Sequence, residues 1–505
     1  MTDRQRIEVG ASQTEPPRRW LALIFISLAQ LMVALDATII NIALPSAQRS
    51  LQFSNADRQW VITAYTLAFG SLLLLGGRLA DMFGRKRTFL IGLLGFAAAS
   101  AGGGAASSFA ALVAARAAQG AFAALLAPTV LSLLALTFTE PRDRAKAFAV
   151  FGAIAGTGGA VGLLLGGVLT QYLSWRWCLL VNVPVAMAAL AGGWALLPSH
   201  RSQLKVRLDV PGVVAVTGGL VAVVYGLSRA ATLGWGSTVV IAALAGGGLL
   251  LAAFVLIEAR VEDPLLPLRI VLDRNRGGAY LTVGLTVLGM YGLFLFLSYY
   301  FQVVVGYSPA RAGVAFLPLS AAVLLGSTVV ARKFLPLVPP RVLIVPGLLV
   351  AAVGLATLSH IGVHTSYLVH VLPGQLLLGF GMGCVFVPAI STATSRVGQR
   401  EAGVASATAN TAQQVGASFG VALLNTIAAT ATASYLASHH PGPLAQAQGL
   451  VHGYAVGAAW AAGLLVMAAI VAGLLINTGK PEPFDGQYQG APSGRVPETT
   501  AGGRP

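Results

Sequence analysis

Long apolar segments alternate with short polar connections along the chain, and this pattern predicts a set of membrane-spanning helices. A helix of about 20 apolar residues is long enough to cross the hydrocarbon core of a bilayer. Fourteen such segments follow one another, at residues 20–44, 60–80, 88–106, 109–136, 147–170, 177–197, 211–228, 238–257, 279–304, 310–331, 342–361, 367–390, 403–432 and 450–476. We therefore expect an all-α membrane protein with fourteen transmembrane helices.

The composition agrees with a membrane protein. Hydrophobic residues make up 56% of the 505 positions and charged residues only 10%, with a mean hydropathy of +0.77, whereas soluble domains carry about 25% charged residues. Cys178 and Cys384 lie far apart in apolar segments and lack the spacing of metal ligands. We expect two buried thiols, no metal and no cofactor.

The formal net charge of +15 would suggest nucleic-acid binding in a soluble protein. In membrane proteins, however, Lys and Arg gather in cytoplasmic loops. With both termini in the cytoplasm, 26 of the 32 basic residues fall on the cytoplasmic side, Arg116 lies inside a span, and 5 fall outside. The outer five are Arg49, Arg58, Arg176, Arg229 and Arg311. This asymmetry predicts a protein of the inner or plasma membrane with cytoplasmic termini, and it accounts for the charge without a nucleic-acid partner.

The segment GGRLADMFGRKR at residues 76–87 joins the second and third spans. Gly77 and Gly84 allow helix ends to pack closely, while Asp81 and Arg85 place opposite charges at the cytoplasmic ends of two helices. Such charges pair when helices meet and separate when they part. We expect these four residues to form a gate latch, and the alternative is a basic loop that only sets orientation.

This segment resembles the cytoplasmic loop signature of the major facilitator superfamily. Other segments resemble signatures of its drug:proton antiporter branch with fourteen transmembrane helices, the multidrug efflux transporters. They are LDATIINIALP (35–45), RAAQG (116–120), WRWCLLVNVP (175–184), YYFQVVVGYSPARAGVAFLP (299–318) and GVASATANTAQQVGASFGVAL (403–423). The resemblance covers nearly the whole chain. It implies two six-helix bundles of inverted repeats around a central cavity, with two additional helices between them.

The resemblance also implies a division of the chain. The expected sections are a disordered cytoplasmic tail at 1–17, an N-terminal six-helix bundle at 18–200, two linking transmembrane helices at 201–262, a C-terminal six-helix bundle at 263–476 and a second disordered cytoplasmic tail at 477–505. Both tails contain few large apolar residues, which is typical of disordered segments.

The fifth span, GAIAGTGGAVGLLLGGVLT, is rich in glycine. Gly162, Gly166 and Gly167 give it small-residue faces for close helix packing, and we expect them at the gate. The antiporter signature that it resembles has Gly-Pro before the final Gly-Gly, whereas Leu163 follows Gly162 here. A proline would have kinked the helix, so the effect of its absence on coupling stays open. Plain packing is an equally good interpretation of the glycines.

Two charges lie deep in predicted spans, Asp36 in the first and Arg116 in the fourth, and Asp36 is the only acid inside any span. A charge in the hydrocarbon core is costly unless it is paired, and such residues commonly serve transport. With the resemblance, we expect Asp36 to carry a proton and Arg116 to pass or tune it. The alternatives are an Asp36 bonded to Thr38, Asn41 or the backbone, and an Arg116 paired with backbone carbonyls.

Polar and aromatic side chains on several spans are candidates for substrate contact in the implied cavity. They are Asp36, Tyr65, Gln119, Tyr299, Gln302, Asn410, Gln413 and Gln414. Apart from Asp36, each is alternatively a packing residue or a helix–helix hydrogen-bonding residue.

These features favour proton-coupled export of amphipathic or cationic small molecules by alternating access, in antibiotic resistance or metabolite export. A facilitator or importer of a polar molecule is less favoured, because few charged groups lie inside the spans. A transport-inactive sensor is a further alternative. An enzyme is disfavoured, because the sequence contains neither paired acids within a span nor a phosphate-binding loop. The expected partners are the substrate, protons and the lipid bilayer, and we expect a monomer.

Overall fold

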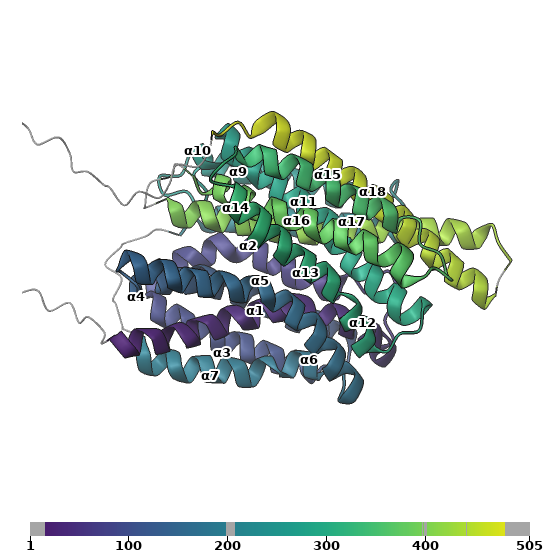
Figure 1. The fold of residues 1–505 in the computed structure, drawn as a ribbon, viewed down its shortest axis with the longest axis horizontal. Coiled ribbons are helices and arrows are strands. Elements are labelled where there is room, and N and C mark those ends of the chain that lie inside the picture. The colour runs from purple at the N-terminus through teal and green to yellow at the C-terminus, as the bar shows by residue number, and fades with distance from the viewer. Residues whose placement is uncertain (1–15, 198–207, 396, 398–400, 441, 480–505) are drawn as a thin grey trace, which may run out of the picture.

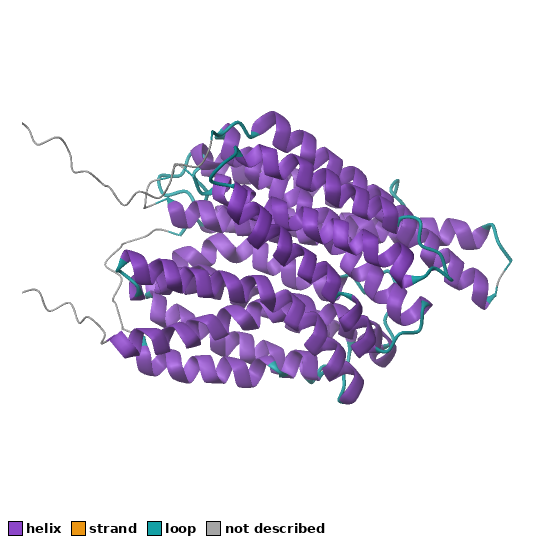
Figure 2. Ribbon diagram, in the orientation of Figure 1, coloured by secondary structure: helices purple, strands orange, loops and turns teal. Residues whose placement is uncertain are grey.

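The computed structural model describes residues 16–479 except 198–207, 396, 398–400 and 441. Every regular element in these ranges is a helix (Figure 2). Most of the expected tails at 1–17 and 477–505 lie outside the described residues, as does the predicted boundary at residue 200. Residues 16 and 17, predicted to be disordered, are the first residues of a helix.

The first half of the chain forms one helical bundle, coloured purple to blue in Figure 1. Its helices are α1 (Pro16–Leu51), α2 (Trp60–Phe83), α3 (Arg85–Gly104), α4 (Phe109–Thr137), α5 (Pro141–Tyr172), α6 (Trp177–Leu180) and α7 (Asn182–Leu196). The span predicted at 177–197 is therefore divided into α6 and α7. The helix α8 (Val210–Leu233) and the helix α9 (Thr238–Glu258) follow as a hairpin.

The second half of the chain forms the other bundle, coloured teal through green to yellow in Figure 1. Its elements are α10 (Leu268–Val271), α11 (Arg274–Tyr299), the π-helical turn η1 (Tyr300–Val304), α12 (Pro309–Ala315), α13 (Leu317–Leu325), the π-helical turn η2 (Gly326–Ala331), α14 (Arg332–Phe334), α15 (Pro340–Leu358), the π-helical turn η3 (Tyr367–Val371), α16 (Leu372–Ala393), α17 (Ala402–Ala437) and α18 (Pro443–Leu475). The hairpin of α8 and α9 lies beside α2 and α17, one helix from each bundle.

The expectation of an all-helical membrane fold is confirmed. Thirteen described helical segments are long and apolar enough to cross a membrane. The remaining predicted span, 88–106, forms α3, whose first turn carries three basic residues, and it packs against α4 and α7 like its neighbours. Those charges lower its mean hydropathy, although its place in the bundle is that of a spanning helix.

The first helix does not end at Pro45, as the predicted span 20–44 implied, but continues to Leu51. A proline inside a helix lacks an N–H, so the carbonyl four residues earlier loses its helical donor. That carbonyl belongs to Asn41, and it accepts a hydrogen bond from Ser298 Oγ of the second bundle at 2.6 Å. The proline therefore frees a backbone acceptor for a contact between the two bundles.

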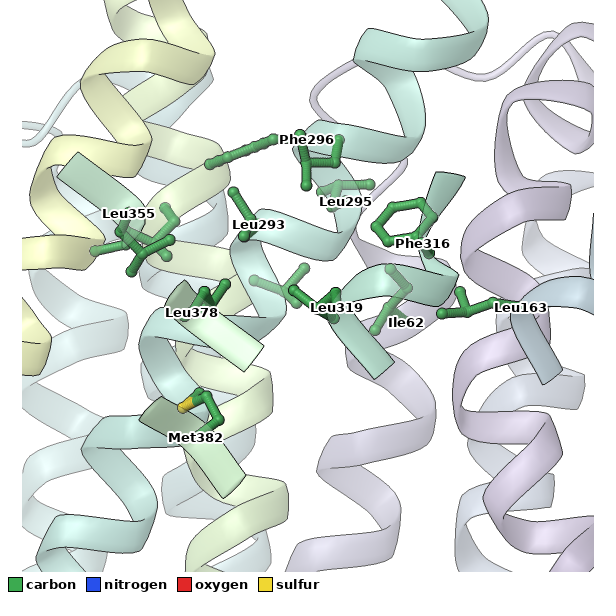
Figure 3. Packing of buried hydrophobic residues seen from close by; sticks show 14 of the residues in the cluster. Ile62, Leu163, Leu293, Leu295, Phe296, Phe316, Leu319, Leu355, Leu378 and Met382 are labelled. Carbon is green, nitrogen blue, oxygen red and sulfur yellow. The ribbon is translucent and has the colours of Figure 1, made fainter. Parts of the chain in front are cut away.

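The two bundles share one apolar core at one end only. We call the end where α1 begins and α18 ends the near end, and the opposite end the far end; the near end is on the left in Figure 1. The largest buried apolar cluster joins residues of both bundles, and Figure 3 shows Ile62 and Leu163 of the first beside Phe316 and Leu319 of the second. Near-end residues of the first bundle, such as Phe89, form a separate cluster. The bundles are therefore packed together at the far end.

Candidate functional site: a buried ion pair in the first bundle

Asp36 lies inside the first bundle and is fully buried. Its Oδ2 accepts a hydrogen bond from Arg116 Nη1 at 2.6 Å. Its Oδ1 accepts from Gln119 Nε2 at 3.0 Å and from Asn182 Nδ2 at 2.8 Å. Three helices, α1, α4 and α7, thus meet at one carboxylate. Three donors, one of them charged, stabilise an ionised carboxylate where water is excluded.

Arg116 is held on several sides. Its Nη1 also donates to Gln119 Oε1 at 2.9 Å, and its Nε donates to the Val61 carbonyl of α2 at 3.0 Å. Its guanidinium carbon lies 4.4 Å from the centre of the Tyr65 ring, which permits a cation–π interaction. The described hydrogen bonds of the Asp36 carboxylate come from side chains of other helices and not from Thr38, Asn41 or the backbone. Arg116 bonds to one backbone carbonyl, as its alternative expected, but it also pairs with the carboxylate.

Local sequence explains how these groups converge. Arg116 and Gln119 are three residues apart on α4, so they share one face of that helix. Asn182 is the first residue of α7, after the interruption that separates it from α6. Gln119 Nε2 also donates to Ser100 Oγ of α3 at 2.7 Å.

Sequence reasoning missed Asn182 and Ser100 as members of this site. Asn182 lies in the quoted segment WRWCLLVNVP as a lone amide in an apolar run, and that pattern is a usable signal for a buried hydrogen-bonding residue. Ser100 lies among alanines and glycines of α3, where a serine is also a common packing residue.

The candidate substrate residues do not form one site. Asp36, Tyr65 and Gln119 belong to the buried cluster around the ion pair. Tyr299 and Gln302 instead line a cavity of about 620 Å³ at the far end. There the Tyr299 hydroxyl donates to Gln48 Oε1 at 2.5 Å and Gln302 Nε2 donates to the Ile42 carbonyl at 3.0 Å, so both connect α11–η1 to α1.

The other three candidates, Asn410, Gln413 and Gln414, lie on α17 and are partly exposed. Helices α2 and α17 approach closely here, because a Cβ added to Gly70 would lie 2.8 Å from the Gln414 Cβ. Substrate contact by these residues stays a prediction.

The predicted latch residues lie at the near end. Gly84 ends α2 with a φ of 88°, a conformation that favours glycine, and a Cβ on Gly77 would touch Pro128 of α4 at 3.8 Å. Asp81 Oδ1 and Arg85 Nη2 are 3.7 Å apart, and both side chains are about a third or more exposed. The pair therefore connects α2 to α3 within the first bundle, and its role as a gate stays a prediction.

The glycines of α5 face two different neighbours. A Cβ on Gly162 or Gly166 would come within 2.9 Å of backbone carbonyls of α1, in the same bundle. A Cβ on Gly167 would instead lie 2.6 Å from the Pro309 carbonyl, at the start of α12 in the second bundle. Leu163 also faces that bundle, since its carbonyl lies 2.7 Å from the Cβ position of Gly313. Of the three predicted gate glycines, Gly167 alone contacts the opposite bundle directly.

Replacing Gly167 by Val is expected to stop transport, because the backbone of α12 cannot approach α5 with a branched side chain between them. The far end would then fail to close. The rate of substrate transport in vesicles, normalised to folded protein, measures the effect. Gly152→Val is the control on the same helix, because a Cβ there meets nothing within 4 Å. Equal rates for both variants would contradict the expectation.

One basic residue assigned to the outer loops is not at the surface. Arg58, in the turn between α1 and α2, is 4% exposed and contacts the second bundle. The sequence analysis placed Arg58 on the outer side from its position between two spans, and the structure shows that this turn contacts the second bundle.

The comparisons with known proteins agree with this architecture. The Major Facilitator Superfamily profile matches residues 26–421. The chain belongs to this superfamily. Among similar proteins, the puromycin resistance protein pur8 of Streptomyces alboniger is 54% identical over 474 residues, covering 94% of each chain. The cephamycin export protein CmcT of Amycolatopsis lactamdurans is 41% identical, covering 83% of this chain and 87% of that protein.

Solved structures share the facilitator fold at low sequence identity. An auto-inhibited POT family peptide transporter matches with a TM-score of 0.65 and 18% identity, covering 91% of this chain and 96% of the other. A bacterial homologue of the human lysosomal transporter Spinster, described as inward-facing and unoccupied, matches with a TM-score of 0.64 and 17% identity, covering 91% and 97%. The resemblance to this superfamily inferred from the motifs is confirmed, and the chain is a multi-pass membrane transporter.

Proposed function

We propose that this facilitator exports small molecules from the cell in exchange for protons, with Asp36 as the proton carrier. The observation that supports this most is the buried pair of Asp36 and Arg116. Of the salt bridges among the described residues, this is the one in which both side chains are buried, and it lies inside the first bundle where α1, α4 and α7 meet. Ionisable residues in such positions mark proton pathways in transporters.

The relatives support an exporter. The two similar proteins named above are known for puromycin resistance and cephamycin export, and a third, the tetracenomycin C resistance and export protein of Streptomyces glaucescens, is 35% identical over 419 residues. We infer that the substrate is an amphipathic or cationic small molecule of the antibiotic class, and that puromycin is the first compound to test.

The charge distribution supports cytoplasmic termini in the cell membrane, so the near end would face the cytoplasm. Because the two bundles pack together at the far end, we propose that this is the state that receives substrate from the cytoplasm. One charge moving through 100 mV supplies about 2.3 kcal/mol, which is enough to drive concentrative export. We propose that transport needs no metal or cofactor and that a monomer carries it out.

The test is exchange in proteoliposomes with puromycin as the probe. An imposed pH gradient is expected to drive labelled puromycin into vesicles with an acidic interior, and dissipating the gradient should stop it. Uptake that equilibrates at the same rate without a gradient would instead indicate a facilitator. A broad panel of compounds is tested in the same way. If none of them is transported and an overexpressing strain is resistant to none of them, the sensor alternative is favoured.

A further inference from the structure

A second buried arginine, Arg58, lies at the far end and is not used by the proton site. Its Nε and Nη2 donate to Asn425 Oδ1 at 3.3 and 3.2 Å, and its Nη1 donates to the Tyr454 hydroxyl at 3.4 Å. Its guanidinium carbon lies 4.1 Å from the centre of the Tyr299 ring. All three partners belong to the second bundle, so this side chain joins the bundles directly.

Arg58 is held by neutral groups. Among the described residues, the salt bridges involve other arginines and leave Arg58 without a carboxylate within 4 Å. A guanidinium stays charged at any physiological pH, so its hold on the second bundle depends on hydrogen-bond geometry and on aromatic contact. Such a contact is sensitive to small movements of the backbone that carries the arginine.

The first turn of α2 connects Arg58 to the ion pair. The Val61 N–H donates to the Arg58 carbonyl at 3.3 Å. The Val61 carbonyl accepts from Arg116 Nε at 3.0 Å, and Arg116 Nη1 donates to Asp36 at 2.6 Å. An unbroken chain of hydrogen bonds and one helical turn therefore leads from the proton site to the contact between the bundles.

Two other hydrogen bonds between the bundles lack this connection to the ion pair. The Ala310 N–H of α12 donates to Gln171 Oε1 of α5 at 3.1 Å, and Thr66 Oγ1 lies 2.8 Å from Ser418 Oγ. The described contacts of these four residues do not include Arg116. Arg58 therefore differs from these two contacts in its link, through Val61 and Arg116, to the charge of Asp36.

We propose that Arg58 is a positioning residue that couples the charge of Asp36 to closure of the far end. Ionised Asp36 holds Arg116, which fixes the Val61 carbonyl and the first turn of α2, and Arg58 then stays seated on the second bundle. A neutral Asp36 holds Arg116 less strongly, the turn loosens, and the far end opens more readily. This inference rests on the proposed function, because it assigns the route by which the proton acts.

The experiment measures opening of the far end with a cysteine reporter, Ser418→Cys, at the buried contact of α17 with α2. A membrane-impermeant maleimide is added on the far side of oriented vesicles. Protein without the reporter cysteine is labelled in parallel, and its rate is subtracted to correct for the native Cys178 and Cys384, which are buried. Asp36→Asn, which mimics the neutral acid, is expected to raise the initial labelling rate several-fold when Arg58 is present.

In an Arg58→Ala background the labelling rate is expected to be high already and to change less than twofold on adding Asp36→Asn. Arg58→Lys, which keeps the charge but not the planar fork, should give an intermediate response. Its labelling rate should also stay below the maximum rate, that of unfolded protein, so a further increase caused by Asp36→Asn can still be measured. Gln171→Ala is the control, because it removes a bond between the bundles that is unconnected to Arg116, and the Asp36→Asn effect should persist there.

A purely structural role for Arg58 predicts a different result. The labelling rate would rise for Arg58→Ala, but Asp36→Asn would raise it by the same factor with and without Arg58. That outcome would overturn the proposal. An unchanged rate for Asp36→Asn with Arg58 present would overturn it as well. Because the labelling uses no substrate, its outcome is separate from that of the puromycin exchange, so failure of proton coupling and failure of this route are distinguishable.

Discussion

Accumulation of substrate against a gradient is expected to disappear in the Asp36→Asn variant. The amide keeps the size of the side chain and can still bond to its neighbours, but it cannot take up or release a proton. Without that step, the energy of the proton gradient does not reach the substrate. Uptake driven by a pH gradient in proteoliposomes should therefore fall to the level of protein-free vesicles, whereas counterflow of labelled against unlabelled substrate can persist.

Asp263→Asn is the matched control for this prediction. It makes the same chemical change at an exposed residue after α9, and it should leave driven uptake at the wild-type rate. If Asp36→Asn accumulates substrate as well as wild type does, Asp36 is not the proton carrier and the assignment fails. Driven uptake is normalised to the amount of monodisperse protein recovered in detergent, so that a loss of folded protein is not mistaken for a loss of coupling.

The second large effect is expected for Arg116→Gln. This change leaves Asp36 buried with amide donors but without a cation, and removing one partner of a buried ion pair typically costs about 3–5 kcal/mol. We expect a marked drop in the midpoint of thermal unfolding in detergent, together with loss of transport. The measurement is the fraction of monodisperse protein remaining after heating.

The double variant Asp36→Asn with Arg116→Gln tests the cause of that loss. Neutralising both groups removes the unpaired charge, so the double variant should recover more than half of the lost thermal stability without recovering transport. Arg260→Gln, at an exposed position, is the control for removing a cation. Additive losses in the double variant would show that Arg116 stabilises the bundle by packing and not through Asp36.

Both predictions concern a pair that the sequence revealed only in part. Asp36 and Arg116 were found because a charge in an apolar segment is easy to recognise. Their direct contact was not predicted, and neither was the contribution of Asn182, 146 residues away from Asp36. A lone amide such as Asn182 in an apolar run indicates a buried hydrogen bond, but the local sequence does not specify which residue is its partner.

The contact between the bundles at the far end was also not predicted from the sequence. Arg58 looked like an ordinary loop cation, and Pro45 looked like the end of a helix. The turn that contains Arg58 instead folds between the bundles, while the carbonyl freed by Pro45 bonds to Ser298. Both outcomes depend on which helices of the second bundle pack against these two segments of the first.

The sequence by itself determined the all-helical membrane fold, the order of the apolar helices along the chain, and the presence of one deep acid and one deep cation. A spanning helix satisfies its backbone hydrogen bonds within its own segment and needs about 20 apolar residues, so the local sequence alone indicates these features. Only the tertiary structure decided that Asp36, Arg116, Gln119 and Asn182 share one site, and that the bundles are closed at the far end. Those facts arise from contacts between segments far apart in sequence, which no local pattern specifies.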